Sequence, residues 1–221
     1  IYQAGTFFLS AFLYVTAAMT PITALAAPAD LNEAAAQQEE RLTLPIQSNE
    51  IENWPEGPAV GAEGAIVLEA NTGVVLYAKN IHEKLYPAST TKLLTCLIAA
   101  RECSMDEIVT FSHDAVFGIQ QGSSNIGIDE GQAMTMEECL YGILVASANE
   151  VAAAVAEHVA GSQEAFADMM NETARELGCQ DSHFVNPHGL FDENHYTSAY
   201  DLAIIAKAFF QNELLSKLGN T

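Results

Sequence analysis

The sequence predicts an α+β fold, in which an antiparallel sheet accompanies a set of helices. Two observations lead to this prediction: two β-type runs joined by a tight turn occur early, and apolar residues at helical spacing dominate the later chain. With 221 residues and 49% hydrophobic side chains, the chain can build one sizeable core. Two strands alone do not make a stable sheet, so either further strands follow Thr221 or the two runs form no real sheet.

Residues 1–26 have the pattern of a secretory signal peptide. No charged residue occurs before Asp30, an apolar run spans residues 7–19, and Pro21 and the small Ala26 follow it. A transmembrane anchor or a buried helix is the alternative, but the run is short. A basic start and an initiator methionine are missing, so we expect the chain to be truncated at its start. The expected location is extracytoplasmic, either secreted or associated with the cell envelope.

Residues 27–60 are acidic and polar, and they predict a linker with room for a helix in part of it. The first structured element after it is a β-hairpin, with strands expected at Ala65–Glu69 and Val74–Tyr77. The sequence ANTG between these strands suits a tight turn because asparagine and glycine tolerate the backbone angles that such turns need.

Helices follow the hairpin. Ser89 is a good helix starter, and Thr135 with Glu138 forms a capping box. Residues 106–112 predict a short strand and residues 118–134 a long loop. The sequence ASAN interrupts one helical pattern, and glycines end two others. The first predicted helix begins near Ser89, and the later ones cover residues 136–145, 150–160, 163–177 and 199–210.

Charge and composition argue against several functions. The formal net charge of −21 opposes binding to nucleic acid, or to anionic lipid through basic residues. The four cysteines form no C-x-x-C pair, and the six histidines form no H-E-x-x-H motif. We therefore expect no metal site and no other cofactor, and we expect Cys96 to be packed within an apolar helix.

Ser89 and Lys92 form the first candidate catalytic pair. They lie one helical turn apart, so their side chains can face one cleft. A neutral lysine amine can take the proton of a serine hydroxyl, and a helix N-terminus in apolar surroundings favours that neutral form. The backbone N–H of Ser89 can also face a developing oxyanion. The spacing S-x-x-K alone is a weak signal, which a capped helix with a solvated lysine also explains.

Ser147 and Asn149 form the second candidate pair, 58 residues after Ser89 in a break between apolar helices. A hydroxyl and an amide two residues apart in a turn can both point into one cleft. The serine can relay a proton and the asparagine can bind a substrate carbonyl. The alternative is a helix N-cap for the segment that begins at Glu150.

The combination of S-x-x-K and S-x-N resembles the penicillin-recognising serine enzymes. More closely, the chain is similar to the low-molecular-mass D-alanyl-D-alanine carboxypeptidases of the peptidase S11 family. The resemblance covers residues 61–210 and includes GAIVLEANTGVVLYAKN, YPASTTKLLTCLIA and FVNPHGLFDENHYTSAYDLAIIAKA. It implies a transpeptidase fold with an antiparallel sheet and a helical subdomain, of whose catalytic domain residues 61–221 form the N-terminal part.

The resemblance also implies a function. Ser89 is expected to be the acylated nucleophile and Lys92 its base, with Ser147 catalytic and Asn149 binding the substrate. The expected substrates are peptidoglycan stem peptides ending in D-Ala-D-Ala, and β-lactams are expected to acylate the same serine. No cofactor is implied.

One departure from the family is the absence of its third motif, K-T-G on a strand. Lys217 and Gly219 lack the hydroxyl residue between them, and a helix end with a glycine cap explains both. We expect the chain to stop before this motif, the later sheet strands and any C-terminal membrane anchor. Residues 27–221 alone are therefore expected to lack carboxypeptidase activity.

Two other functions remain open from the sequence. A class A-like β-lactamase shares both motifs but adds an E-x-x-L-N segment, which no glutamate of the later chain begins. A non-catalytic module that binds the cell wall or senses β-lactams would keep the fold, although the intact Ser89, Lys92, Ser147 and Asn149 argue against it.

Overall fold

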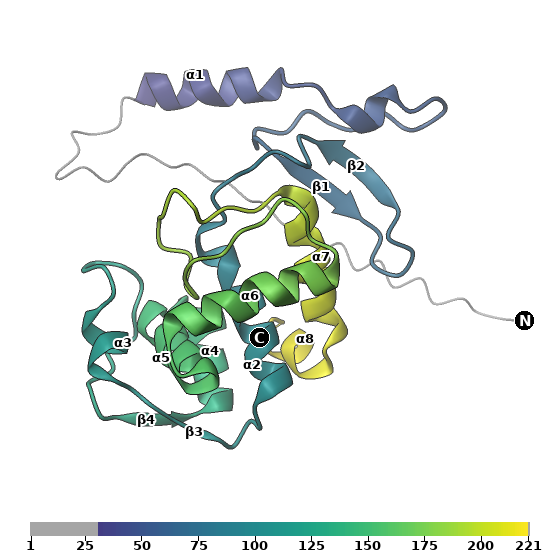
Figure 1. Cartoon of the computed structure of the whole chain (residues 1–221). Coiled ribbons are helices and arrows are strands. Elements are labelled where there is room, and N and C mark those ends of the chain that lie inside the picture. Colours follow the sequence, from purple (N-terminus) through teal and green to yellow (C-terminus); the bar gives the residue numbers. More distant parts are fainter. Residues whose placement is uncertain (1–30, 221) are drawn as a thin grey trace, which may run out of the picture. The chain divides into compact units, whose positions relative to one another are not determined.

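The computed structural model describes residues 31–220, and the signal peptide expected at residues 1–26 lies outside them. The chain divides into two compact units, of which the first ends at Ile81 and the second begins at His82. Figure 1 shows the elements of each unit. Within the described residues, no helix is both long and apolar enough to cross a membrane.

The first unit contains a helix, a 3-10 turn and a β-hairpin. Its elements are α1 (Leu31–Leu42), η1 (Gln47–Glu50), β1 (Ala65–Leu68) and β2 (Val75–Lys79). The strands pair antiparallel, with Ala65 opposite Lys79. Gly73 has φ +75°, and the Glu69 carboxylate accepts hydrogen bonds from Thr72, which hold its pKa at about 2. The predicted hairpin and its turn are confirmed.

Part of the segment predicted as a linker packs on this hairpin. Lys79 is buried, and its Nζ donates to the carbonyl oxygens of Arg41 (2.5 Å) and Val60 (2.7 Å). The backbone N–H of Ala78 donates to Ser48 Oγ over 3.3 Å. These contacts join α1, η1 and the hairpin into one unit, while the catalytic domain assigned to residues 61–221 stays a prediction.

The second unit is mainly helical. Its helices are η2 (Ala88–Thr91), α2 (Lys92–Glu102), α3 (His113–Phe117), α4 (Met136–Ala146), α5 (Asn149–Ala160), α6 (Gln163–Leu177), α7 (Ala199–Gln211) and α8 (Glu213–Leu218). Its strands β3 (Ile108–Thr110) and β4 (Ala133–Thr135) pair antiparallel. The core lies around α2 and α5, which pack against each other and against α4 and α6.

The sequence of α5 explains its central place. Residues 151–156 are valine and alanine, and all of them are buried. Small side chains let neighbouring helices approach closely, and burying them removes apolar surface from water.

Caps place the helix ends where the sequence predicted them. Thr135 and Glu138 form both hydrogen bonds of a capping box at the start of α4. Ser162 caps α6, and Gly161 and Gly178 end α5 and α6 in the left-handed conformation. By contrast, α3 and β4 were not predicted, because five and three residues are too few to show a period.

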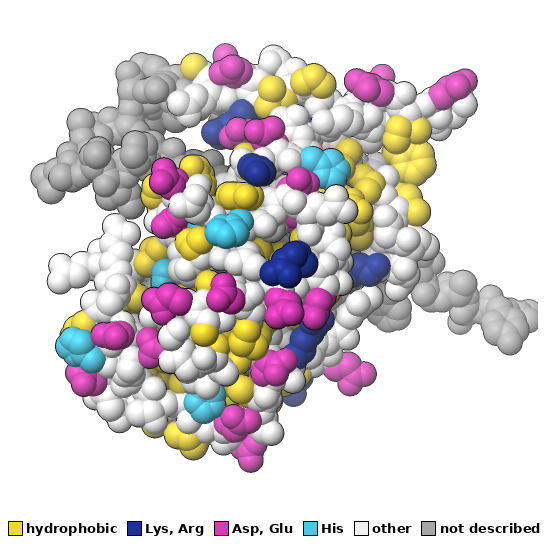
Figure 2. All heavy atoms as spheres, in the orientation of Figure 1, with side chains coloured by type: hydrophobic (Ala, Val, Ile, Leu, Met, Phe, Trp, Pro, Cys, Tyr) yellow, Lys and Arg dark blue, Asp and Glu magenta, His cyan; other side chains and the backbone are white. Residues whose placement is uncertain are grey.

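The surface matches the acidic composition. On the face drawn in Figure 2, acidic side chains are widely scattered and basic side chains are few. Negative charges that are spread over a surface in this way favour solubility and oppose binding to polyanions.

Candidate active site

Local backbone structure presents Ser89 at the start of α2. Ala88 has φ +49°, an uncommon value for a residue with a side chain. The 3-10 turn after it runs directly into α2, of which Lys92 is the first residue. Ser89 and Lys92 are therefore one turn apart, as predicted, and the Lys92 side chain is buried rather than solvated.

Lys92 Nζ is the centre of the site. It donates to the His188 carbonyl oxygen over 2.6 Å and to Asn149 Oδ1 over 2.7 Å, and it lies 3.3 Å from Ser89 Oγ. The structure thus brings together three segments that are up to 96 residues apart in the chain.

The pKa of the Lys92 amine is lowered to about 8, chiefly by burial, while Cys96 and Glu150 act in the opposite direction. About one amine in ten is then neutral at pH 7. A neutral amine has two N–H bonds and one lone pair. The two shortest contacts go to pure acceptors, so the lone pair is left for the hydroxyl of Ser89.

Ser147 completes the group around Ser89. It ends α4 in the left-handed conformation (φ 56°, ψ 32°), and its Oγ lies 3.0 Å from Ser89 Oγ. A residue with a side chain costs about 1–2 kcal/mol in this conformation. The next residue, Ala148, is extended and buried, and Asn149 begins α5 with its N–H bonded to the Ser124 carbonyl.

The loop that carries His188 contributes a backbone carbonyl to the site, and the sequence did not predict this contribution. His188 Nδ1 accepts from the Leu190 N–H over 3.2 Å, and burial together with Lys92 lowers its pKa to about 3. The ring is therefore neutral at pH 7, and the carbonyl serves Lys92. Thr95 Oγ1 donates to the Pro187 carbonyl and ties the loop to α2.

Gly189 allows this loop to approach the backbone beside Ser89. It has φ +82°, and a Cβ built on it would lie 1.8 Å from the Ala88 carbonyl oxygen. Gly189→Ala is therefore expected to destabilise the helical unit by about 3 kcal/mol, measured by urea unfolding with far-ultraviolet circular dichroism.

Gly178→Ala is the matched control, because Gly178 also has positive φ (+96°), but among the described residues nothing beyond Gly178 and its chain neighbours lies within 4 Å of its built Cβ. It is expected to cost only about 1 kcal/mol, the price of the backbone conformation. Equal losses in the two variants would show that the loop does not depend on the close approach.

Glu150 is a further charged residue of the site that sequence reasoning did not place there. It is buried, and its Oε1 accepts from the Ile126 N–H over 2.6 Å. Its Oε2 has no hydrogen-bond partner among the described residues. The carboxylate acts on Lys92 by charge and raises the pKa of the amine against the effect of burial.

Glu150→Gln removes this charge and keeps the shape and the acceptor for Ile126. We expect the pKa of the Lys92 amine to fall further below about 8, as measured by NMR titration of isotope-labelled lysine. Glu157→Gln is the control, because Glu157 lies two turns along α5 and bonds Ser112 instead. An unchanged or higher Lys92 pKa in Glu150→Gln would contradict this role.

The structure places three other residues that the sequence singled out at the helix positions predicted for them. Lys217 and Gly219 form the last turn and the cap of α8, as the helix-end interpretation predicted. Cys96 is buried in α2, and the four cysteines are free.

Most of the chain is similar to known protein sequences. The profile of the D-alanyl-D-alanine carboxypeptidase family, peptidase S11, matches residues 51–221. The D-alanyl-D-alanine carboxypeptidase DacF of Bacillus subtilis is 41% identical over 166 residues, which cover 72% of this chain and 42% of DacF. DacD of Salmonella typhimurium is 36% identical over 170 residues, which cover 72% and 43%. The chain spans less than half the length of these two relatives.

Solved structures agree with the sequences. The D-alanyl-D-alanine carboxypeptidase DacD from Francisella tularensis has a TM-score of 0.72 and 30% identity, over 77% of this chain and 42% of that one. Penicillin binding protein 6B from Escherichia coli has a TM-score of 0.69 and 33% identity, over 74% and 55%. The predicted α+β fold of the penicillin-binding-protein type is confirmed. The chain belongs to the D-alanyl-D-alanine carboxypeptidase family, peptidase S11.

Proposed function

We propose that the protein is a serine-type D-Ala-D-Ala carboxypeptidase, which removes the terminal D-alanine from peptidoglycan stem peptides outside the cytoplasm. One observation carries the proposal: Ser89 Oγ lies 3.3 Å from Lys92 Nζ and 3.0 Å from Ser147 Oγ. A nucleophile, a buried amine of lowered pKa and a second hydroxyl are the groups that acyl transfer needs.

In the acylation step, neutral Lys92 takes the proton of Ser89, and Ser89 Oγ attacks the carbonyl carbon of the penultimate D-alanine. The backbone N–H of Ser89 faces the oxyanion that forms. The proton passes from Lys92 through Ser147 to the departing nitrogen. The C–N bond breaks, D-alanine leaves, and the peptide remains as an ester on Ser89.

In the deacylation step, water attacks the carbonyl carbon of the ester. The water gives one proton to the Lys92 amine by way of the Ser147 hydroxyl. The C–O bond to Ser89 breaks, the serine hydroxyl regains a proton, and the shortened peptide leaves. A penicillin presents a similar amide and would acylate Ser89 by the first step.

Asn149 is proposed to hold the substrate. Its Oδ1 accepts from Lys92, which fixes the amide plane and leaves Nδ2 as a donor to a substrate carbonyl. Because the Asn149 side chain contacts both the base and the substrate, it aligns the base with the substrate.

The test uses the protein expressed from its complete gene. D-alanine release from a diacyl peptide ending in D-Ala-D-Ala, together with slow loss of a covalently bound fluorescent penicillin, supports the proposal. Fast penicillin hydrolysis without D-alanine release would indicate a β-lactamase instead. Absence of both activities would indicate a non-catalytic binding module.

A further inference from the structure

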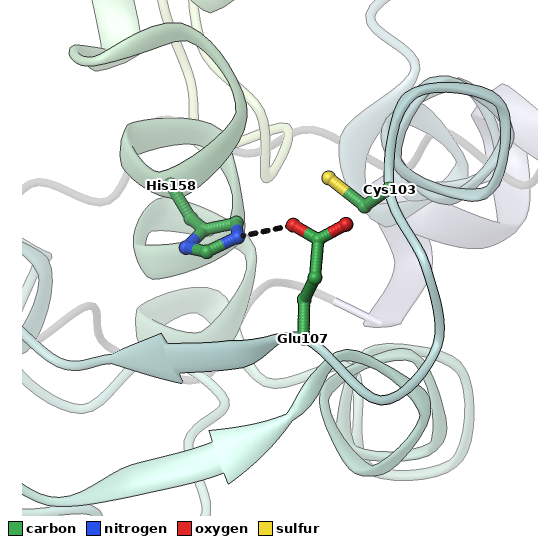
Figure 3. A group of neighbouring side chains, drawn as sticks. All are labelled: Cys103, Glu107 and His158. Atoms are coloured by element: carbon green, nitrogen blue, oxygen red, sulfur yellow. Dashed lines mark hydrogen bonds and ion pairs between the residues drawn. The ribbon is translucent and has the colours of Figure 1, made fainter.

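Three side chains of different chemistry converge at the C-terminal ends of α2 and α5. The Cys103 Sγ, a Glu107 carboxylate oxygen and a His158 ring nitrogen all lie within 4.8 Å of one another. Figure 3 shows the three side chains pointing toward one another, with Glu107 between the other two. The His158 Nε2 lies 3.1 Å from Glu107 Oε2.

The backbone holds this group in place. Cys103 is the C-cap of α2, and its N–H donates to the Ala99 carbonyl. A tight turn follows, in which the Ser104 N–H donates to Glu107 Oε1 over 2.6 Å. This contact orients the carboxylate so that Oε2 faces His158. The Glu107 carbonyl accepts from the Met136 N–H, which ties the turn to α4.

We propose that Cys103, Glu107 and His158 bind a zinc ion. Thiolate, imidazole and carboxylate are the protein ligands of Zn²⁺, and three of them with an open fourth position form a known type of site. Bonds of about 2.0–2.3 Å in a tetrahedron require ligand atoms about 3.5 Å apart. The observed separations need only small side-chain movements to reach this value.

Charge and access agree with this assignment. Ionised Cys103 and Glu107 carry two negative charges, which match a divalent cation. The side chains of His158 and Glu107 are 26% and 42% exposed, so an ion can enter and water can fill the fourth position. Sulfur and nitrogen donors disfavour Ca²⁺ and Mg²⁺, which take oxygen ligands.

The same group does not suit a cysteine nucleophile. A catalytic thiol needs the imidazole beside it, whereas here the imidazole bonds Glu107, which stands between them. Burial and the neighbouring Glu107 raise the pKa of the Cys103 thiol to about 11. When zinc binds, the S–H bond is exchanged for a Zn–S bond and the proton leaves to solvent.

The proposed ion would act as a clamp and not in the reaction. It joins the C-terminal ends of the two helices whose N-terminal ends carry Lys92 and Asn149. Along an 11-residue helix these ends are about 16 Å apart, so the ion touches no reacting atom. The inference is therefore independent of the proposed function.

The test is titration of the whole chain with zinc chloride by calorimetry, in a reductant that does not bind metal. We expect one ion per chain and a higher thermal unfolding temperature. Cys103→Ser, Glu107→Gln and His158→Gln should each weaken binding at least about tenfold. Cobalt substituted for zinc should show a thiolate charge-transfer band that Cys103→Ser removes.

His113→Gln is the matched control. His113 Nδ1 lies 2.9 Å from Glu130 Oε2, a similar pair of imidazole and carboxylate on the same unit. Among the described residues, this pair is not part of the group of three possible ligands that includes a thiol. This variant should bind zinc like the parent. Lack of zinc binding by the parent, full binding by Cys103→Ser, or an equal loss in His113→Gln would each overturn the proposal. Circular dichroism checks that every variant is folded.

Discussion

Ser89→Ala is expected to abolish covalent labelling by a fluorescent penicillin and to lower D-alanine release by at least about 10⁴-fold. The reason is that Ser89 Oγ lies near both Lys92 Nζ and Ser147 Oγ, which can accept and pass on its proton. Without the oxygen no acyl-enzyme forms. The measurement is labelling and D-alanine release by the protein expressed from its complete gene.

The control for this variant is Ser123→Ala. Ser123 is a loop serine whose Oγ donates to the Gln120 carbonyl, and its removal should leave labelling unchanged. Ser89→Ala should also keep its thermal unfolding temperature within a few degrees, because it deletes one small polar group. Persistent covalent labelling of Ser89→Ala at another residue, located by peptide mass spectrometry, would refute the assignment of the nucleophile.

The elements that the sequence predicted are those with strong local signals. The capping box at Thr135, the serine cap at Ser162 and the glycines at 161 and 178 each act within a few residues, so they can be read directly. The short strand β4 has no such signal, because its pairing with β3 is set about 25 residues away in the chain.

The candidate site divides in the same way. The spacing of Ser89 and Lys92 is local, and the structure places Ser147 and Asn149 beside them. The carbonyl of His188 could not be predicted, because any residue supplies one and only the folded loop aims it at Lys92.

The proposed zinc ligands could not be predicted from the sequence for a related reason. No metal site was expected because no short motif of cysteines or histidines occurs, whereas His158 lies 51 residues from Glu107. The three ligands come together only when α5, which carries His158, packs against β3, which Glu107 directly precedes.

Lys92→Arg is expected to reduce acylation almost as much as Lys92→Ala, by about 10³-fold. Arginine keeps the positive charge, but its guanidinium stays protonated near neutral pH and cannot take the proton of Ser89. It also does not fit the buried position, where Nζ meets two carbonyl-type acceptors 2.6 and 2.7 Å away. The measurement is the second-order rate constant for acylation by a penicillin.

The pH dependence of the same rate tests the role of Lys92 as a base. Since only the neutral amine accepts a proton, and its pKa is about 8, the parent rate should rise about tenfold per pH unit below 8 and level off above it.

Lys84→Arg is the control for Lys92→Arg, because Lys84 lies over the Tyr196 ring, where arginine can replace it. A Lys92→Arg rate within about tenfold of the parent would make Lys92 an electrostatic helper, because a permanent cation would then suffice.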